Sequence, residues 1–295
     1  MPDAVGFIGL GAMGKPMALN LRKQDVTLVV HNRSQPAERV LAEAGAGIAT
    51  TPAAVAAACQ VIVIMLPDAP DMAAVLEGER GLLESLQPGT VVVDSSTIAP
   101  AAARRFATLV AARGGTYLDA PVSGGEVGAV DGTLTFMVGG DADALAAVRP
   151  WLAMMGQDER IVHVGPSGAG QVCKACNQLV IGGTMLAVAE ALALARKSGV
   201  DGAKVRQALL GGFAASRVLE VHGERMLNAN YKPGFRAKLY QKDLRIVAET
   251  LAQQGVAAPG LALVQQLVNA QLAAGGGDDD YSGLAQVVFG LAGLD

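Results

Sequence analysis

The sequence predicts an α/β domain built on a doubly wound parallel sheet, followed by an all-α domain that a long helix opens. Up to about residue 165, short β-branched runs alternate with amphipathic stretches, the pattern of a parallel sheet with helices on both faces. After Gly165 and Pro166, no stretch alternates convincingly with a period of two, and helical patterns dominate. The two domains are therefore expected at residues 1–165 and 166–295.

The individual elements follow from the same patterns in chain order. In the first domain, strands are expected at 5–8, 26–30, 61–65, 91–94, 117–119, 135–138 and 161–164. The helices between them are expected at 13–21, 36–44, 52–58, 71–76 and 100–112. In the second domain, glycine-rich breaks separate helices expected at 171–197, 203–210, 216–227, 242–253, 261–273 and 281–291.

The composition indicates a globular chain and argues against nucleic acid as its main partner. Of the 295 residues, 51% are hydrophobic and 17% are charged, which is enough for a large core. The net charge is −4 and no basic block occurs, whereas nucleic-acid-binding domains carry basic patches. An anionic substrate is still compatible with this balance, since local charge can oppose the global sign.

Neither a disulfide framework nor a metal site is expected. The chain has three cysteines and three histidines, and the histidines are far apart without ligand spacing. Cys173 and Cys176 have the spacing of a redox motif but not its usual surroundings, which leaves redox or zinc chemistry as a minor alternative. The low cysteine count and the absence of a leader pattern at the start predict a cytoplasmic protein.

The apolar run 179–195 is interpreted as a buried helix or a subunit interface. It contains Thr184 and Glu190 and is short for a bilayer span, so no membrane association is expected. A homodimer or homotetramer is predicted instead. Glu190 is a candidate second acid, although a structural or interface role is the more usual one in such a helix.

A glycine-rich turn follows the first expected strand and opens the first expected helix. Its glycines have G-x-G-x-x-G spacing in the strand–turn–helix context that this motif needs. The first glycine permits the tight turn, the second lets the backbone approach a diphosphate, and the third allows close helix–strand packing. The alternative is a glycine-rich turn without a ligand. The motif predicts a Rossmann-type cofactor site formed by Gly9, Leu10, Gly11, Ala12, Met13 and Gly14.

The residues after the second expected strand predict which dinucleotide binds. An NAD site has a carboxylate there for the ribose 2′-hydroxyl. This chain has Asn32, Arg33 and Ser34 instead, and the planar guanidinium of Arg33 suits a 2′-phosphate. NADP(H) is therefore the expected cofactor, with NAD(H) as the second choice. The alternative is an Arg33 that only faces solvent.

Two further segments end at the carboxyl edge of the expected sheet, where ligands lie in such folds. They are Met65, Leu66 and Pro67, and the pair Ser96 and Thr97. The first segment is expected to line the cofactor. The hydroxyls of the second pair serve a ligand or, with about equal weight, cap the next helix.

A short polar stripe interrupts the apolar helix expected at 171–197. At about 100° per residue, Gln171, Lys174, Asn177 and Gln178 fall on one face, and the residues that follow on this face are not polar. An ammonium is seldom buried unpaired in apolar surroundings, because its desolvation is costly. The stripe therefore faces a wet cleft or a ligand, and Lys174 is a candidate proton donor.

Ser123, Gly124 and Gly125 place a hydroxyl and two unhindered amides after the strand expected at 117–119. Consecutive backbone N–H groups can form a nest for a carboxylate. Taken alone, the segment is better explained as a glycine turn.

Four motifs in this order resemble the β-hydroxyacid dehydrogenase family, from residue 5 to about residue 290. They are residues 7–14, 119–125, 168–178 and 242–243. The family includes 3-hydroxyisobutyrate dehydrogenases, tartronate semialdehyde (2-hydroxy-3-oxopropionate) reductases and 6-phosphogluconate dehydrogenase. Residues 123–126, 177–178, 211–216 and 232–235 are most similar to the tartronate semialdehyde reductases. Many relatives have a second asparagine where this chain has Gln178.

The resemblance implies roles for individual residues. Lys174 matches the catalytic lysine, and Asn177 matches the amide that orients the substrate. Ser123, Gly124 and Gly125 match the loop that holds the substrate carboxylate. The remaining matches are to cofactor-lining positions: Leu66, Pro67, Asp71, Thr97 and, from the helical domain, Lys242.

The activity implied is reversible NADP(H)-dependent reduction of a small carboxylate-bearing aldehyde to its hydroxyacid, with Lys174 as general acid and base. Tartronate semialdehyde is the first choice of substrate. Succinic semialdehyde, glyoxylate and 3-hydroxyisobutyrate are the alternatives. Oxidative decarboxylation of a phosphorylated sugar acid is disfavoured, because the expected helical domain of about 130 residues is short for it. The non-enzyme alternative is a catalytically silent NADP-binding module, against which the presence of Lys174 argues.

Overall fold

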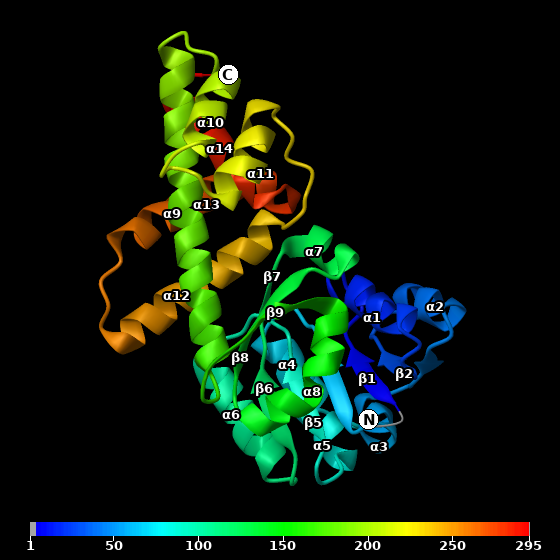
Figure 1. Cartoon of the computed structure of the whole chain (residues 1–295). Coiled ribbons are helices and arrows are strands. Elements are labelled where there is room, and N and C mark those ends of the chain that lie inside the picture. Colours follow the sequence, from blue (N-terminus) through cyan, green and yellow to red (C-terminus); the bar gives the residue numbers. More distant parts are fainter. Residues whose placement is uncertain (1–3, 295) are drawn as a thin grey trace. The chain divides into compact units, whose positions relative to one another are not determined.

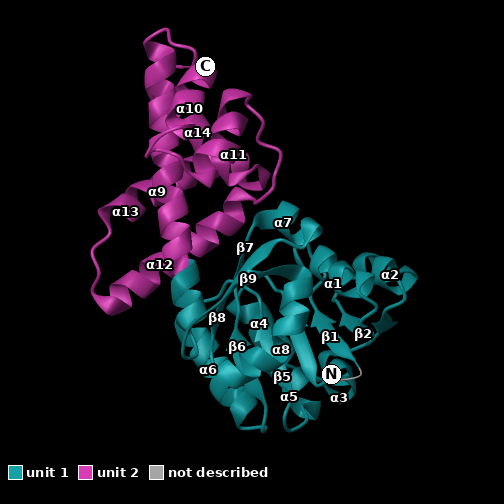
Figure 2. Cartoon of the chain, viewed as in Figure 1, with its two compact units in different colours: residues 1–174 teal, residues 175–295 magenta. Residues whose placement is uncertain are grey.

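The structure is a computed structural model that describes residues 4–294 and divides into two compact units (Figure 2). The first unit comprises residues 1–174 and the second residues 175–295. The long helix expected at 171–197 is present as α9 (Ala169–Lys197). The boundary between the units falls within α9, after the position near residue 165 that the change of sequence pattern suggests.

A nine-stranded sheet forms the centre of the first unit in the described part of the chain (Figure 1). Its strands run in the order β3-β2-β1-β4-β5-β6-β8-β7, with β9 paired to β8. The strands are β1 (Val5–Ile8), β2 (Leu28–His31), β3 (Gly47–Ile48), β4 (Val61–Ile64), β5 (Val91–Asp94), β6 (Thr116–Asp119), β7 (Val122–Ser123), β8 (Leu134–Gly139) and β9 (Gly156–Gly165). The pairs from β3 to β6 are parallel, as the strand–helix alternation predicts.

The β-branched runs form central strands because the sheet buries both of their faces. β1 and β4 are buried at every position, which is typical of parallel strands covered on both sides. Alternate side chains enter two different cores: Phe7 and Val63 belong to one, and Ile8 and Ile64 to the other. The doubly wound architecture is therefore confirmed at the level of individual side chains.

Eight helices surround this sheet among the described residues of the first unit. They are α1 (Gly14–Lys23), α2 (Gln35–Glu43), α3 (Pro52–Ala58), α4 (Ala69–Glu77), α5 (Leu82–Ser85), α6 (Pro100–Ala111), α7 (Gly125–Asp131) and α8 (Ala142–Met155). The short elements β3, β7, α5 and α7 are not anticipated by the sequence pattern, nor is α8. Pro150 lies inside α8, but burial of Val148, Trp151 and Leu152 in the core prevails over its poor helix propensity.

The sheet departs from purely parallel pairing at its far edge. β8 runs antiparallel to both β6 and β7, and β9 then adds to β8 in parallel. Residues 124–133, which include α7, connect β7 to β8, and this connection is shorter than the dozen or more residues of a parallel crossover.

The second unit is helical, as expected. Besides α9 it contains α10 (Gly202–Leu210), α11 (Arg217–Leu227), α12 (Ala237–Gln254), α13 (Pro259–Ala273) and α14 (Leu284–Leu291), with 3-10 turns at Gly276–Asp278 and Tyr281–Gly283. Its core joins residues of several helices, including Met185, Tyr240, Val264 and Phe289.

The length and composition of α9 alone would suffice for a membrane span. Its most apolar 18-residue window has a mean hydropathy of 1.7, and half of that window is buried inside the fold. Core helices of globular proteins have the same properties, so composition does not distinguish the two cases.

Candidate active site

The glycine-rich turn between β1 and α1 has the geometry that a dinucleotide needs. Gly9 has a φ of +93°, and a Cβ there would collide with the carbonyl oxygen of Met65. A Cβ at Gly14 would collide with the carbonyl oxygen of Gly9. At Gly11, by contrast, a Cβ would meet nothing within 4 Å. α1 begins at Gly14 without a side-chain cap. These residues would hold the diphosphate of NAD(P)(H) against the amino end of α1.

Asn32 links this turn to the loop that follows β2. Its Oδ1 accepts a hydrogen bond from the Leu10 amide at 2.9 Å, and its Nδ2 donates to the carbonyl oxygen of Ser34 at 2.9 Å. Its own amide donates to Oε1 of Glu38 at 2.7 Å. Asn32 therefore shapes the predicted cofactor turn, and Glu38, which the sequence does not single out, supports it.

Arg33 projects into solvent from the same loop. Its side chain is 94% exposed, and its guanidinium lies 3.9 Å from the carboxylate of Asp71 in α4. Two of the predicted cofactor residues are thereby brought together. A guanidinium in this position is accessible to a 2′-phosphate, and it has no tight internal partner to give up among the described contacts.

The loops after β4 and β5 are tied together through Ser96. Its Oγ accepts from the Leu66 amide at 2.9 Å, and its own amide donates to Oδ1 of Asp94 at 2.9 Å. α6 has Ala99 as its N-cap and no side-chain cap, so the capping alternative for Ser96 and Thr97 is not supported. The predicted cofactor residues Met65, Leu66, Pro67 and Thr97 lie on these two joined loops.

Asp94 is fully buried beneath the two loops. Besides the Ser96 amide, it accepts a 2.6 Å hydrogen bond from the Tyr117 hydroxyl. Burial raises the pKa of Asp94 to about 6, although hydrogen bonds from Ser96 and Tyr117 lower it. The same burial raises the pKa of Tyr117 well above its usual value. Asp94 thus holds the loop that contains Ser96 in place at the end of β5.

A second buried carboxylate, Asp119, anchors the start of α9. Its Oδ1 accepts from the Gly168 amide at 2.7 Å and its Oδ2 from the Gln171 amide at 2.9 Å. Desolvation raises the pKa of Asp119, and these backbone hydrogen bonds oppose the rise. A carboxylate at a helix amino end also interacts favourably with the helix dipole. Asp119 therefore holds the first turn of α9 against the end of β6.

Lys174 lies in the second turn of α9 and is 8% exposed. Its Nζ donates a 2.8 Å hydrogen bond to the carbonyl oxygen of Val122 in β7. Since Val122 immediately precedes Ser123, this contact places the ammonium next to the predicted carboxylate loop. The segment 119–125 thus both anchors α9 and orients the lysine that α9 carries.

The loop after Val122 has the backbone expected of a nest. Gly124 has a φ of +137° and Gly125 a φ of +64°, conformations that glycine adopts without strain. Both glycines are exposed, and α7 begins at Gly125 without a side-chain cap. The amides at this helix start are suited to an anionic group.

Asn177 and Lys242 are joined by a polar chain within the second unit. The Nδ2 of Asn177 donates to Oε1 of Gln178 at 2.8 Å, and the Nε2 of Gln178 donates to Oδ2 of Asp243 at 2.6 Å. Lys242 forms an ion pair with the other oxygen of Asp243 at 2.9 Å. Gln178 and Asp243 are both buried. Gln178 therefore fixes the amide of Asn177, which is a more specific role than that of a subfamily marker.

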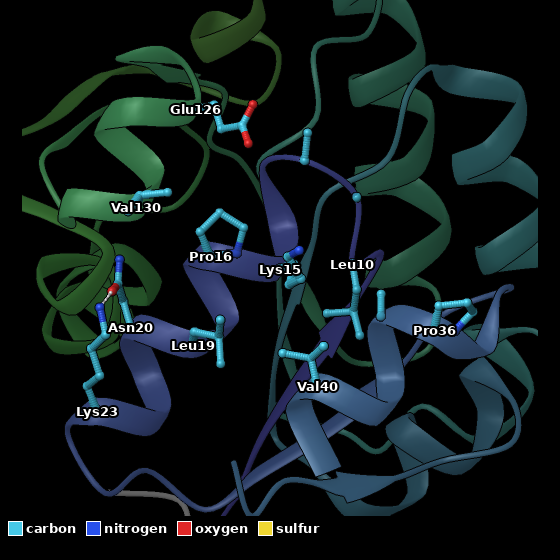
Figure 3. Close-up of a pocket in the computed structure, with 13 residues that line it drawn as sticks. Leu10, Lys15, Pro16, Leu19, Asn20, Lys23, Pro36, Val40, Glu126 and Val130 are labelled. Atoms are coloured by element: carbon cyan, nitrogen blue, oxygen red, sulfur yellow. Dashed lines mark hydrogen bonds between the residues drawn. The ribbon is translucent and has the colours of Figure 1, made fainter. Parts of the chain in front are cut away.

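A cavity of about 570 Å³ borders the glycine-rich turn (Figure 3). Residues of α1, α2 and α7 line it together with Leu10, Gly11 and Ala12 of the turn. The side chains of Lys15, Lys23 and Glu126 contribute charge, and Lys23 donates a 2.8 Å hydrogen bond to Asn20. Leu10, Gly11 and Ala12 thus belong both to this cavity and to the predicted cofactor turn, whereas the predicted cofactor residues after β2, β4 and β5 do not line it.

The structure also bears on the minor candidates. Among residues 4–294, no group of three or more histidine, cysteine or acidic side chains could hold a metal. Cys173 is half-buried, whereas Cys176 and Glu190 are exposed. The sequence missed the anchoring roles of Asp94 and Asp119. A carboxylate that ends an otherwise apolar strand was the available signal in both cases.

Comparison with known proteins agrees with the four motifs. Residues 4–165 match the model of the NAD binding domain of 6-phosphogluconate dehydrogenase. Residues 168–288 match the NAD-binding model of NADP-dependent 3-hydroxyisobutyrate dehydrogenase. The chain is 44% identical over 284 residues to a 2-hydroxy-3-oxopropionate reductase of Escherichia coli (strain K12), covering 96% of both chains.

Solved structures give the same result. A 3-hydroxyisobutyrate dehydrogenase of Mycobacterium tuberculosis with L-serine has a TM-score of 0.87 at 32% identity, covering 98% of this chain and 99% of that chain. Psf3 in complex with NADP+ and 2-OPP has a TM-score of 0.88 at 27% identity, covering 96% and 99%. The chain therefore belongs to the 3-hydroxyisobutyrate dehydrogenase-related family of NAD(P)-dependent oxidoreductases that act on CH–OH groups.

Proposed function

We propose that this enzyme interconverts tartronate semialdehyde and glycerate with NADP(H), with Lys174 as general acid and base. The observation that carries the proposal is the 2.8 Å hydrogen bond from the Lys174 ammonium to Val122, directly before the Ser123–Gly125 loop. A proton donor on α9 and the predicted anion-binding loop thus meet at Val122. The 44% identity to the E. coli reductase supports this choice of substrate.

The residues divide the reaction between them. The Ser123 hydroxyl and the amides of Gly124 and Gly125 would bind the substrate carboxylate, which orients the aldehyde. The nicotinamide supplies a hydride when it is bound. Lys174 stabilises the negative charge that develops on the carbonyl oxygen and transfers a proton to that oxygen from Nζ. Asn177, fixed by Gln178, would orient the same substrate oxygen.

The cofactor assignment is proposed from the β2–α2 loop. Asn32 stands where an NAD site has a carboxylate, and the exposed Arg33 can meet a 2′-phosphate. The neighbour solved with NADP+ supports this preference. Lys242 is proposed to reach the cofactor from the second unit, paired with Asp243.

Two features of the whole protein are also proposed. A homodimer or homotetramer is supported by exposed apolar side chains on α9, with Val180 66% and Leu194 69% exposed. A content of only three cysteines in 295 residues supports a cytoplasmic location.

A single kinetic panel tests substrate and cofactor together. It measures kcat/KM for tartronate, methylmalonate and succinic semialdehydes and for glyoxylate, with NADPH and with NADH. Tartronate semialdehyde with NADPH is expected to give the highest value. Arg33→Ala is expected to weaken the binding of NADPH by about 10- to 100-fold, the size of a lost charge-assisted contact. The binding of NADH is expected to weaken much less.

Arg39→Ala is the matched control, since Arg39 is an exposed arginine on the adjacent α2. It is expected to leave both cofactors unaffected. Equal losses of NADPH and NADH in Arg33→Ala would contradict the assignment of Arg33. A preference for methylmalonate semialdehyde would identify the enzyme as a 3-hydroxyisobutyrate dehydrogenase instead, the activity named for its structural neighbour.

A further inference from the structure

One buried side chain, Gln171, joins α9 to the loop after β5. It is 1% exposed. Its Nε2 donates to the carbonyl oxygen of Ser96 at 2.8 Å, and its Oε1 accepts from the Ile98 amide at 3.1 Å. Both ends of the side-chain amide are therefore used, and both partners are main-chain atoms of one loop.

The connection extends from this loop to the next. Ser96 accepts a hydrogen bond from the Leu66 amide through its Oγ, which ties the loops after β4 and β5 together. Gln171 attaches these two joined loops to α9. Its own amide is held by Asp119 at 2.9 Å, which fixes the other side of the same residue. Gln171 thus lies between two anchored parts of the first unit.

Lys174 follows Gln171 by three residues on α9, so the two side chains occupy the same helix face. The distance between the Lys174 ammonium and the loops that carry Leu66 and Thr97 then depends on the Gln171 side chain. Both the lysine and the loops have hydrogen bonds that do not involve Gln171. Lys174 donates to the Val122 carbonyl, and the Leu66 amide donates to Ser96. Loss of the Gln171 side chain would therefore shift α9 relative to the loops after β4 and β5 and leave both the helix and the loops formed.

We propose that Gln171 is a positioning residue that sets the proton donor, Lys174, in register with the loops that hold the nicotinamide. This inference rests on the proposed function, in which Lys174 gives the proton and Leu66 and Thr97 line the cofactor. Displacement by about 1 Å far from the reacting atoms can cost about 100-fold in rate. The amide of Gln171 therefore contributes to turnover more than to cofactor binding.

The primary test is Gln171→Met, which preserves length and removes both hydrogen bonds. We expect kcat to fall by about 10- to 100-fold because the register is lost. The Kd for NADPH, measured by fluorescence titration, is expected to stay within about threefold, because the loops remain formed.

A double-mutant cycle separates positioning from general destabilisation. In the Lys174→Ala background, Gln171→Met is expected to cause little further loss of kcat, since the group it positions is absent. Losses that multiply in the double variant would overturn the inference.

Gln271→Met is the matched control. Gln271 is 3% exposed and donates to the carbonyl oxygens of Asp280 at 3.0 Å and Gly276 at 3.4 Å, in the second unit. It is expected to lower the melting temperature, as Gln171→Met does, without lowering kcat. An equal loss of kcat in both variants would show that Gln171 acts only through stability.

Circular dichroism checks that each variant is folded. If Gln171→Met fails to fold, Gln171→Asn takes its place in the cycle, because its shorter amide cannot reach both Ser96 and Ile98. Wild-type turnover in Lys174→Ala would refute the proposed function and this inference together. An inactive Lys174→Ala combined with wild-type turnover in the folded Gln171 variant would refute this inference alone.

Discussion

At the scale of single residues, the site depends on buried carboxylates that take no direct part in the proposed reaction. Asp94 and Asp119 end neighbouring strands of the sheet, and both are fully buried. Burial raises the pKa of each, and hydrogen bonds from the segments that they hold lower it again. The carboxylates therefore order two loops and a helix start at a cost in stability.

The raised pKa of Asp94 predicts that the free energy of unfolding depends on pH. Its pKa is about 6 in the folded state against about 4 in the unfolded chain. Between these values the unfolded state loses its proton first, so the stabilisation present below pH 4 is lost as pH rises to about 6. Relative to Asp94→Asn, the wild type should lose about 3 kcal/mol of unfolding free energy across this window.

Urea denaturation of both proteins at several pH values between 4 and 7 measures this difference. The asparagine retains an acceptor for the Ser96 amide, and Asp119, whose charge helps to raise the pKa of Asp94, is present in both proteins. Parallel stability profiles for the two proteins would show that Asp94 does not have a raised pKa.

At the scale of elements, α9 is positioned by close approach at glycines. A Cβ at Gly170 would collide with the carbonyl oxygens of Asp119 and Met137, so this glycine lets α9 begin against the sheet. Further along, Gly182 faces α12, and a Cβ there would lie 2.5 Å from the Tyr240 hydroxyl, which donates to the Gln178 carbonyl at 3.0 Å. Gly183, its neighbour, is exposed with nothing within 4 Å of such a Cβ.

These adjacent glycines predict opposite effects of the same substitution. Gly182→Ala should destabilise by about 1–3 kcal/mol, because Tyr240 must shift in a packed core. Gly183→Ala should stabilise by up to about 1 kcal/mol through better helix propensity. Thermal unfolding followed by circular dichroism gives both values, and a lower melting temperature for Gly183→Ala than for Gly182→Ala would contradict the described packing.

Some helices and strands can be predicted from sequence patterns alone, and others cannot. Long periodic segments such as α9 and the buried strands β1 and β4 were predicted closely, because burial enforces their periodicity. α8 was missed because Pro150 opposes helix formation locally while the core favours it. β7 has two residues, too few for any pattern, and it exists because it pairs with β8.

At the scale of the whole molecule, the architecture followed from the sequence more readily than the interactions of the site did. Strand–helix alternation and the loss of alternation after residue 165 predicted the α/β and helical parts. The polar stripe on α9 predicted a wet cleft or a ligand, but its members Gln171, Lys174 and Gln178 are buried and bonded to protein groups. One partner of Lys174 is the Val122 carbonyl, a main-chain acceptor that no side-chain pattern reveals. The roles of Asp119 and Gln171 could not be predicted, because their partners lie about 50 and 75 residues away in the chain.

The proposed chemistry depends on one ammonium group, so its removal is the most direct test of the account. The measurement is the kcat for reduction of tartronate semialdehyde with NADPH by the wild type, Lys174→Ala and Lys204→Ala. Lys204 is an exposed lysine of α10 and serves as the control. We predict a loss of about 100-fold or more in Lys174→Ala and none in Lys204→Ala. Wild-type turnover in a folded Lys174→Ala protein would contradict the assignment of Lys174 as the proton donor.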